Sequence, residues 1–458
     1  MTDYDVKYAW RVTPLLSLAS LLVLYTEAML IPSLPYIQRE FNITQADVSW
    51  ILTAYLITGT ICALIFGTLG DMYGKKKLLL TALSLYTLAL ILNGYAPTFR
   101  ALLLSRAVQG VGMAMLPLAY SLVREQFPRR LAPMAQGLIS AMNGVGIIIA
   151  FPVGAWIAQN YGWRTTFHTV APFAILLVVL IALYVRESKF IQHDKRIDLA
   201  GIALFAIFLV SFLIALSKGP QWGWTSEKVI FLIMFSVISL FAFLFHEAKT
   251  EHPFIPREIF NRNVKAAVFA TFVVAFAFQI NSLTLTYLLQ MPKPHGYGLP
   301  VFKAGLYMTP LVLTYLVTAP IAGRVILRVG AKTLSVFGIL TAVLGYSLAV
   351  LHLYDGVMYV LGFMSVGSMG MALLNVSLIN LLTFSAPRER LGLTTALFTT
   401  FRNIGSSIAP PVGGVILTIY RADTVPSPTA YYVNFSIVIA MFLIVLIPIF
   451  FAEEVLKD

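Results

Sequence analysis

Few residues of this chain could do chemistry, because charged side chains are almost absent from its long apolar stretches. Glu27 is the only acidic residue predicted to lie well inside one of them. Burial disfavours the charged form of a carboxyl group, and an acid inside a membrane helix is functional by default. A glutamate that binds either a proton or a cationic solute would couple their movements by competition. The alternative is a structural Glu27 held by Arg106 or another donor.

Two arginines, Arg106 and Arg402, also fall inside apolar stretches. Such residues usually face a cavity or a polar partner, although Arg106 is close enough to the outer surface to reach it by snorkelling. Arg402 could bind anionic groups or balance Glu27, or could be structural. Other polar or aromatic candidates for contact with a solute, each of which could equally serve helix packing, are Tyr55, Asn143, Gln279, Asn281 and Asn375.

The composition requires lipid as the solvent. The chain has 458 residues, of which 59% are hydrophobic and 11% are charged, whereas soluble domains carry about 25% charged residues. The single cysteine, Cys62, excludes a disulfide framework and a multi-thiolate metal site. The chain has no phosphate-binding GxxxxGK[ST] motif, so an ATP-driven pump is not expected. We therefore expect no enzyme, cofactor or metal. The net charge is +12, but the basic residues fall in short loops between the apolar stretches, so the charge does not indicate nucleic-acid binding.

The apolar stretches predict an all-α membrane protein with fourteen spanning helices, because each is continuous and long enough to cross a bilayer. Most Lys and Arg side chains fall in the loops on the side of Met1, which predicts that both termini are cytoplasmic. The predicted spans are 14–34, 48–70, 78–96, 101–123, 134–158, 167–186, 198–217, 228–247, 264–289, 303–325, 333–352, 356–383, 392–417 and 434–452.

The sequence also repeats itself weakly. When residues 137–157 are aligned with 396–416 at an offset of 259, Pro152 meets Pro411 and Gly146 meets Gly405. A second glycine pair recurs at an offset of 256. Chance similarity between Gly- and Pro-containing helices is the alternative. We interpret the repeat as two six-helix bundles separated by two additional helices, with bounds of 1–190, 191–255 and 256–458.

One loop carries a recognisable pattern of glycine, acid and lysines, which runs from Gly67 through Asp71 and Gly74 to Lys75. It resembles the major facilitator signature between the second and third helices. Gly67 permits close helix approach, Gly74 permits a tight turn, and Asp71 could cap a helix N-terminus or pair with a base. These residues would latch the two halves in one state. Met72 replaces the usual arginine, and Arg328 stands at the equivalent place in the second half.

Further motifs, taken in order, resemble the fourteen-helix drug:proton antiporter family of the major facilitators over residues 20–420. The resemblance implies a solute site between the halves, and a role in proton transfer for Arg106. Two departures weaken the match, because Thr26 stands where the family commonly has an Asp, and Phe151 precedes Pro152 where Gly-Pro is usual. The motifs are Arg106-x-x-Gln109-Gly110, Gly162-Trp163-Arg164, His252-Pro253-Phe254 and Phe401-Arg402-Asn403.

These observations predict a proton-coupled exporter of drugs or other small, lipophilic and often cationic compounds, which works by alternating access as a monomer in the plasma membrane. Its partners would be the solute, protons and lipid. The alternatives are a specific metabolite exporter or a proton-solute symporter of the same fold, or a membrane receptor that transports nothing.

Overall fold

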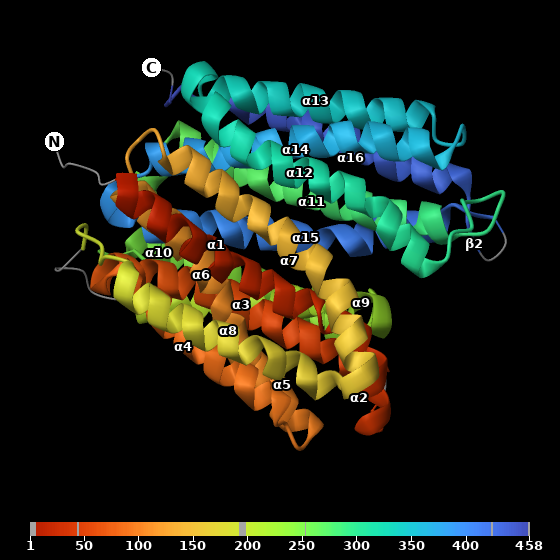
Figure 1. The fold of residues 1–458 in the computed structure, drawn as a ribbon, viewed down its shortest axis with the longest axis horizontal. Helices are drawn as coiled ribbons and strands as arrows, with labels where there is room; N and C mark the ends of the chain where they lie inside the picture. The colour runs from red at the N-terminus through yellow and green to blue at the C-terminus, as the bar shows by residue number, and fades with distance from the viewer. Residues whose placement is uncertain (1–5, 44, 192–197, 252, 423–424, 457–458) are drawn as a thin grey trace. The chain divides into compact units, whose positions relative to one another are not determined.

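The computed structural model describes residues 6–43, 45–191, 198–251, 253–422 and 425–456 (Figure 1). The regular structure within them is helical, apart from the short hairpin of β1 (Arg421–Ala422) and β2 (Val425–Pro426). The longer helices are α1 (Val6–Ala28), α3 (Gln45–Tyr73), α4 (Lys75–Gly94), α7 (Ala132–Tyr161), α8 (Trp163–Tyr184), α9 (Leu199–Trp222), α10 (Glu227–Lys249), α11 (Arg262–Gln290), α12 (Val301–Val329), α13 (Ala331–Leu351), α14 (Val357–Ser385), α15 (Leu391–Ile419) and α16 (Pro428–Phe450).

The shorter helices connect or complete these. The fourth predicted span is built from three consecutive pieces, because the chain tightens into a 3₁₀ turn at Gly110 between two α-helices. These pieces are α5 (Phe99–Gln109), η2 (Gly110–Ala114) and α6 (Met115–Gln126). The remaining short elements lie in the connections, and they are η1 (Ile31–Ser33), α2 (Leu34–Glu40), η3 (Arg257–Ile259) and η4 (Arg388–Arg390).

Thirteen helices among the described residues are long and apolar enough to cross a membrane, with the stretch Phe99–Gln126 counted as one. The predicted count of fourteen is therefore not confirmed. The segment predicted at 392–417 does form a helix of 29 residues, α15, but it is not one of the thirteen. It carries Arg402 together with several Thr, Ser and Asn residues, which make it less apolar than its neighbours.

The first helix differs from its predicted bounds of 14–34. It begins at Val6 and ends at Ala28, and the chain then turns through η1 into α2. Pro32 explains this end, because a proline lacks the N–H that would bond to the carbonyl four residues earlier, that of Ala28, and its ring clashes with that carbonyl. Apolar continuity alone therefore placed the end of the helix six residues too late.

The helix bounds confirm the internal repeat. Adding 256 to the bounds of α3 gives those of α12, and adding 259 to those of α7 gives α15 to within one residue. The repeated glycines have the same role in both places. A Cβ on Gly146 of α7 would lie 2.9 Å from the backbone of Leu21 in α1, and a Cβ on Gly405 of α15 would meet the carbonyl of Phe272 in α11. Both glycines therefore allow two helices to pack closely.

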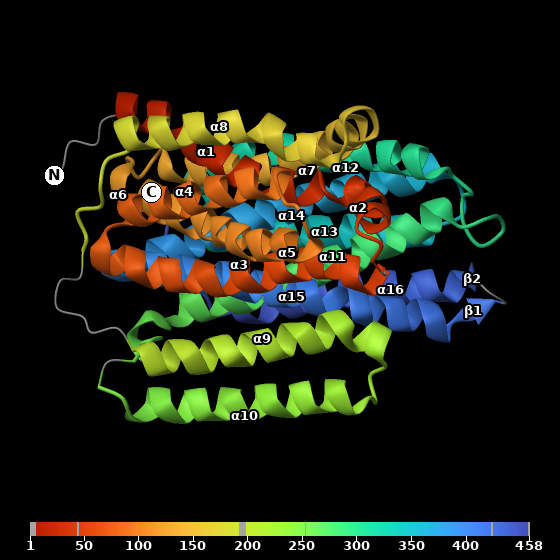
Figure 2. The ribbon, with the colours of Figure 1, turned by 90° about the horizontal axis from the view of Figure 1, so that it is seen from below.

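The described chain divides into two compact units. Unit 1 contains residues 1–260 and 386–400, and unit 2 contains 261–385 and 401–458. The long helix α15 is thus shared, since its first ten residues pack in unit 1 and the rest in unit 2. The two additional helices, α9 and α10, form an antiparallel hairpin in unit 1 (Figure 2). The hairpin is fixed to α3 by a 2.9 Å hydrogen bond between the hydroxyls of Thr53 and Ser217.

Candidate functional site

Arg106 is the centre of a buried polar network in unit 1. Its side chain is fully buried, so the alternative in which it snorkels to the surface is wrong. Its guanidinium donates to Oε1 of Gln109 at 2.7 Å and lies over the ring of Tyr55, 4.5 Å from the ring centroid. Two of its nitrogens, Nε and Nη2, have no hydrogen-bond partner within the described residues. A buried arginine with unused donors is costly, which indicates that its charge has a purpose.

Neighbouring helices hold Gln109 in position. Asn93 on α4 donates to the same Gln109 oxygen at 2.7 Å and accepts from Ser105 at 2.6 Å. The Gln109 amide nitrogen approaches the Thr26 hydroxyl at 3.4 Å, and Thr26 is 2.7 Å from the hydroxyl of Tyr86. Sequence reasoning missed Asn93, Ser105 and Tyr86. The available signal was three polar side chains in otherwise apolar helices, but only the fold brings them to one place.

Glu27 lies beside this network, next to the last residue of α1 rather than in the middle of a span. Its side chain is half-buried and takes part in polar interactions. It is close enough to interact electrostatically with both Arg106 and Tyr55. The structure therefore brings together three of the predicted residues in unit 1. Their predicted roles in binding protons and solute stay predictions.

The other predicted solute contacts are not gathered into this network. Gln279 and Asn281 lie on α11, Asn375 on α14 and Arg402 on α15, all in unit 2. Asn281 is buried, and the other three are half-buried. Asn143 lies on α7, but its side chain is outside the described part of the structure. Their roles stay predictions.

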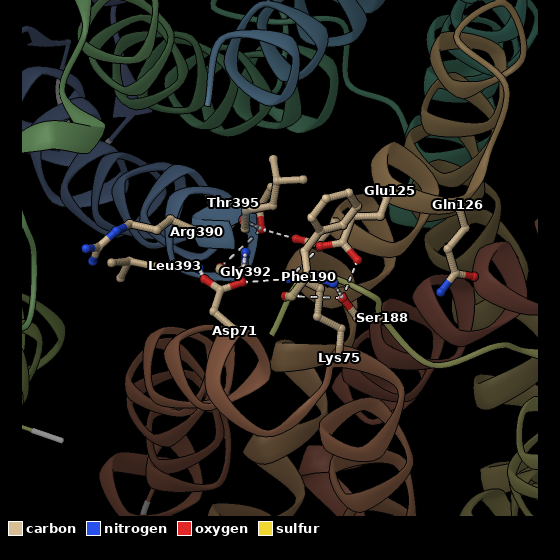
Figure 3. Close-up of polar contacts among 12 residues, drawn as sticks. Asp71, Lys75, Glu125, Gln126, Ser188, Phe190, Arg390, Gly392, Leu393 and Thr395 are labelled. Carbon is tan, nitrogen blue, oxygen red and sulfur yellow. Dashed lines mark hydrogen bonds and ion pairs between the residues drawn. The ribbon is translucent and has the colours of Figure 1, made fainter. Parts of the chain in front are cut away.

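A second polar cluster lies where α4 begins, at the end of unit 1 that carries Lys75, Lys76 and Lys77, called here the basic end (Figure 3). The Lys75 side chain is fully buried between two carboxylates. Its Nζ lies 2.8 Å from Asp71 and 2.6 Å from Glu125. The second Glu125 oxygen accepts from the Ser188 hydroxyl at 2.5 Å. One buried lysine is thus shared by two acids. Buried charges are tolerated when they are paired and when further hydrogen bonds satisfy their remaining atoms, as the Ser188 hydroxyl does for Glu125.

Asp71 also caps α15. Its two carboxylate oxygens accept from the backbone N–H groups of Gly392 and Leu393 at 2.8 and 2.9 Å (Figure 3). A carboxylate is favourable at a helix N-terminus because the first N–H groups have no partner within the helix. Both roles expected of Asp71, as a cap and as an ion-pair partner, are confirmed. The cap fastens the start of α15 within unit 1.

Two glycines of the signature have the expected steric roles. A Cβ on Gly67 would lie 2.5 Å from the carbonyl oxygen of Gly392, so Gly67 lets α3 approach α15. Gly74 has a φ of 107° at the turn into α4, and a Cβ there would collide with the carboxylate of Glu187. Arg328 is exposed near the end of α12 in unit 2, and its part in a latch stays a prediction.

Both units contain a carboxylate cap that sequence reasoning missed. Glu187, beyond the end of α8, accepts from the backbone N–H groups of Lys76 and Lys77 at 2.8 and 3.0 Å. Glu454, beyond the end of α16, accepts in the same way from Lys332 and Thr333 at 3.0 and 3.2 Å. The third helix of each repeat is thereby tied to the sixth. The sequence did not single out these two acids, because they lie outside the apolar spans, where charged residues are common.

The Gly162-Trp163-Arg164 motif ties together three segments of unit 1. The Trp163 indole donates to Glu40 at 2.7 Å, and the Arg164 guanidinium donates to the same carboxylate and to the carbonyl of Ala96 at 2.9 Å. Burial would raise the pKa of Glu40, but these hydrogen bonds and the Arg164 charge outweigh it and hold the pKa below its usual value. The motif is therefore explained by structure and requires no solute.

Comparison with known proteins identifies the family. The model of the Major Facilitator Superfamily matches residues 16–260 and 267–457, nearly the whole chain. This chain belongs to the major facilitator superfamily. The family consists of transporters, so this major facilitator is a membrane transport protein and not an enzyme.

Several relatives of this major facilitator are named for drug resistance. Multidrug resistance protein Stp of Mycobacterium tuberculosis is 26% identical over 92% of this chain and 79% of its own length. Multidrug transporter protein MdtP of Bacillus subtilis is 26% identical over 84% of this chain and 71% of its own. The tetracenomycin C resistance and export protein of Streptomyces glaucescens is 26% identical over 86% of this chain and 73% of its own length. At a coarse level these names support drug efflux.

Solved structures share the fold. The proton:xylose symporter XylE matches with a TM-score of 0.69 at 15% identity, over 98% of this chain and 97% of its own. The human organic anion transporter MFSD10 matches with a TM-score of 0.65 at 14% identity, over 96% of this chain and 99% of its own. These two proteins differ in what they carry. The likeness therefore shows the major facilitator fold alone.

Proposed function

We propose that this major facilitator is a drug:proton antiporter that exports small, lipophilic and often cationic compounds across the plasma membrane. It would work by alternating access as a monomer, with both termini in the cytoplasm and with the architecture of the fourteen-helix drug:proton antiporter family. The names of the relatives from Mycobacterium, Bacillus and Streptomyces support export of drug-like compounds. The excess of Lys and Arg at the basic end supports the orientation.

One observation carries the proton-coupling part of this proposal. A half-buried carboxylate, Glu27, lies within electrostatic range of a fully buried arginine, Arg106, whose guanidinium retains two unused donors. When Glu27 is charged, it balances Arg106. When it binds a proton, that balance is lost beside a fully buried arginine, where charges are screened less than in bulk water. Protonation of one side chain therefore changes the energy of the whole network around Gln109.

The proposed exchange follows from competition at Glu27. A cationic compound and a proton cannot both neutralise the same carboxylate, so binding of one expels the other. Exchange of one proton for one monovalent cation moves no net charge, so the pH difference drives it, and each pH unit is worth about 1.4 kcal/mol, or about a tenfold solute gradient. For a neutral compound the electrical part adds about 2.3 kcal/mol per 100 mV. The further solute contacts that we propose are Tyr55, Asn143, Gln279, Asn281, Asn375 and Arg402.

The basic end is the proposed latch. In the present arrangement Asp71 holds the first turn of α15 within unit 1, and Lys75 forms ion pairs with both Asp71 and Glu125. All ten residues from Leu391 to Thr400 are buried. Release of α15 from Asp71 would expose this segment, so we propose that the latch closes the cytoplasmic side in one state of the cycle.

The experiment that tests the proposal is transport of a fluorescent lipophilic cation into or out of proteoliposomes, with and without an imposed pH gradient. Glu27→Gln should abolish the effect of the gradient, because a glutamine cannot carry a proton. Glu227→Gln is the matched control, since Glu227 is exposed at the start of α10. Gradient-driven transport by Glu27→Gln at the normal rate would refute the assignment, and no gradient effect in the unmodified protein would refute antiport.

A further inference from the structure

We propose that a groove between α1 and α7, near the basic end of unit 1, binds a phospholipid with an anionic headgroup. The two helices pack side by side (Figure 1). Both begin at the basic end, since Tyr8 of α1 contacts Gln126, which precedes α7, and accepts from the backbone N–H of Arg186 at 2.9 Å. The groove is lined on α1 by Ala9, Trp10 and Thr13, and on the other side by Leu131, just before α7, and by Met134, Ala135 and Leu138 of α7.

The chemistry of the groove favours an acyl chain over a transported solute. The groove is shallow and open along one side, so it does not enclose a drug-sized ligand. Two lining side chains carry a polar group. The hydroxyl of Thr13 already donates to the carbonyl of Ala9 at 2.7 Å, and Trp10 is 49% exposed, so its indole N–H is placed to meet water or a headgroup. The other lining side chains are apolar, and part of a hydrocarbon chain can lie along them.

The charges beside the groove select the headgroup. Lys7, Arg129 and Arg130 are exposed, and they precede the groove residues of α1 and α7 by only a few positions. The sequence contains no Asp or Glu between 6 and 11 or between 129 and 138. Both helices also direct their N-termini, the positive ends of their dipoles, to this end. Basic pockets between membrane helices on the cytoplasmic side favour anionic lipids.

Trp10 marks the depth at which the headgroup would lie. Its side chain is 49% exposed although it lines the groove. Tryptophan concentrates at the level of lipid headgroups, where its ring is apolar and its N–H can reach water. Arg11, the neighbouring base, lies over the ring of Tyr184, 5.5 Å from the centroid, and so faces α8. We therefore place the lipid headgroup beside Lys7, Arg129 and Arg130, and the acyl chain in the groove beneath Trp10.

The test is native mass spectrometry of the purified full-length protein titrated with phosphatidylglycerol or phosphatidylcholine of equal chain length. The unmodified protein should retain phosphatidylglycerol in preference. A variant with Lys7→Gln, Arg129→Gln and Arg130→Gln should lose this preference by roughly tenfold or more. The matched control removes three exposed charges elsewhere, through Arg257→Gln, Lys265→Gln and Arg324→Gln, and should keep it.

A second variant separates the groove from the charges. Met134→Trp fills the groove and leaves every base in place, so it should weaken retention of phosphatidylglycerol although the net charge is unchanged. This variant also keeps the test decisive if the triple variant fails to fold. Equal retention of the two lipids by the unmodified protein, an unchanged preference in both variants, or an equal loss in the control would overturn the proposal.

Discussion

Asp71→Asn is expected to open the latch at the basic end. The aspartate accepts one backbone N–H on each carboxylate oxygen and pairs with Lys75. Asparagine retains one acceptor, and its amide nitrogen would face an N–H of α15, donor against donor. A hydrogen bond to a charged group is worth about 1.5–3 kcal/mol. Loss of about 2–3 kcal/mol corresponds to a shift of roughly 30- to 150-fold toward the released state of α15.

The assay uses a cysteine as a reporter of this release. Cys62 is the only cysteine of the chain, so Cys62→Ser gives a thiol-free background. Thr399→Cys then places one thiol on the buried first part of α15, where Thr399 is 2% exposed. Asp71→Asn should accelerate its labelling by a membrane-impermeant maleimide by one to two orders of magnitude. The control is Glu258→Gln, because Glu258 is 79% exposed in its 3.5 Å pair with Arg390. Equal labelling rates for Asp71→Asn and this control would refute the latch.

Two further predictions concern the ties within each unit. Glu187→Gln and Glu454→Gln should each lower the melting temperature in detergent by about one degree, since a lost helix cap costs about 1 kcal/mol; equal melting curves for variant and parent would contradict the role of the caps. The tie at Glu40 should depend on pH. The pKa of Glu40 is lower in the folded protein than in the unfolded chain. Glu40 therefore contributes to stability above the ordinary glutamate pKa, and this contribution is lost as the pH falls through the depressed pKa. Trp163 fluorescence should change over that acidic range and not in Arg164→Gln.

Much of the candidate latch could be predicted from the sequence. The spacing of Gly67, Asp71 and Gly74 indicated close packing, a cap and a turn, and each of these roles is found. The identity of the capped helix was not predictable, because α15 begins more than 300 residues later in the chain. Glu125 was missed for a related reason. It follows the predicted end of its span, where an acid is normally solvated, and only the packing of α4 against α6 brings it to Lys75.

The network around Arg106 shows more clearly what could not be predicted from the sequence. The sequence identified Glu27, Tyr55 and Arg106 separately, since charged or polar residues in apolar segments stand out. It did not indicate that Asn93 and Gln109 hold the arginine in place. Hydrogen bonds across helices depend on the rotation and depth of each helix, which follow from the packing of all the neighbours. Sequence patterns specify which face of a helix is apolar, but not which partner that face meets.

By itself, the sequence determined the solvent, the helical class, the internal repeat and the family, because each depends on composition or on spacing along one chain. Lipid requires continuous apolar helices with internally satisfied backbones, and this constraint is visible in the sequence alone. The tertiary structure decided that Arg106 is buried, that Lys75 joins two acids, and that α15 starts within unit 1. These features arise from contacts between distant segments, whose energies depend on distances of a few ångströms that the order of residues does not specify.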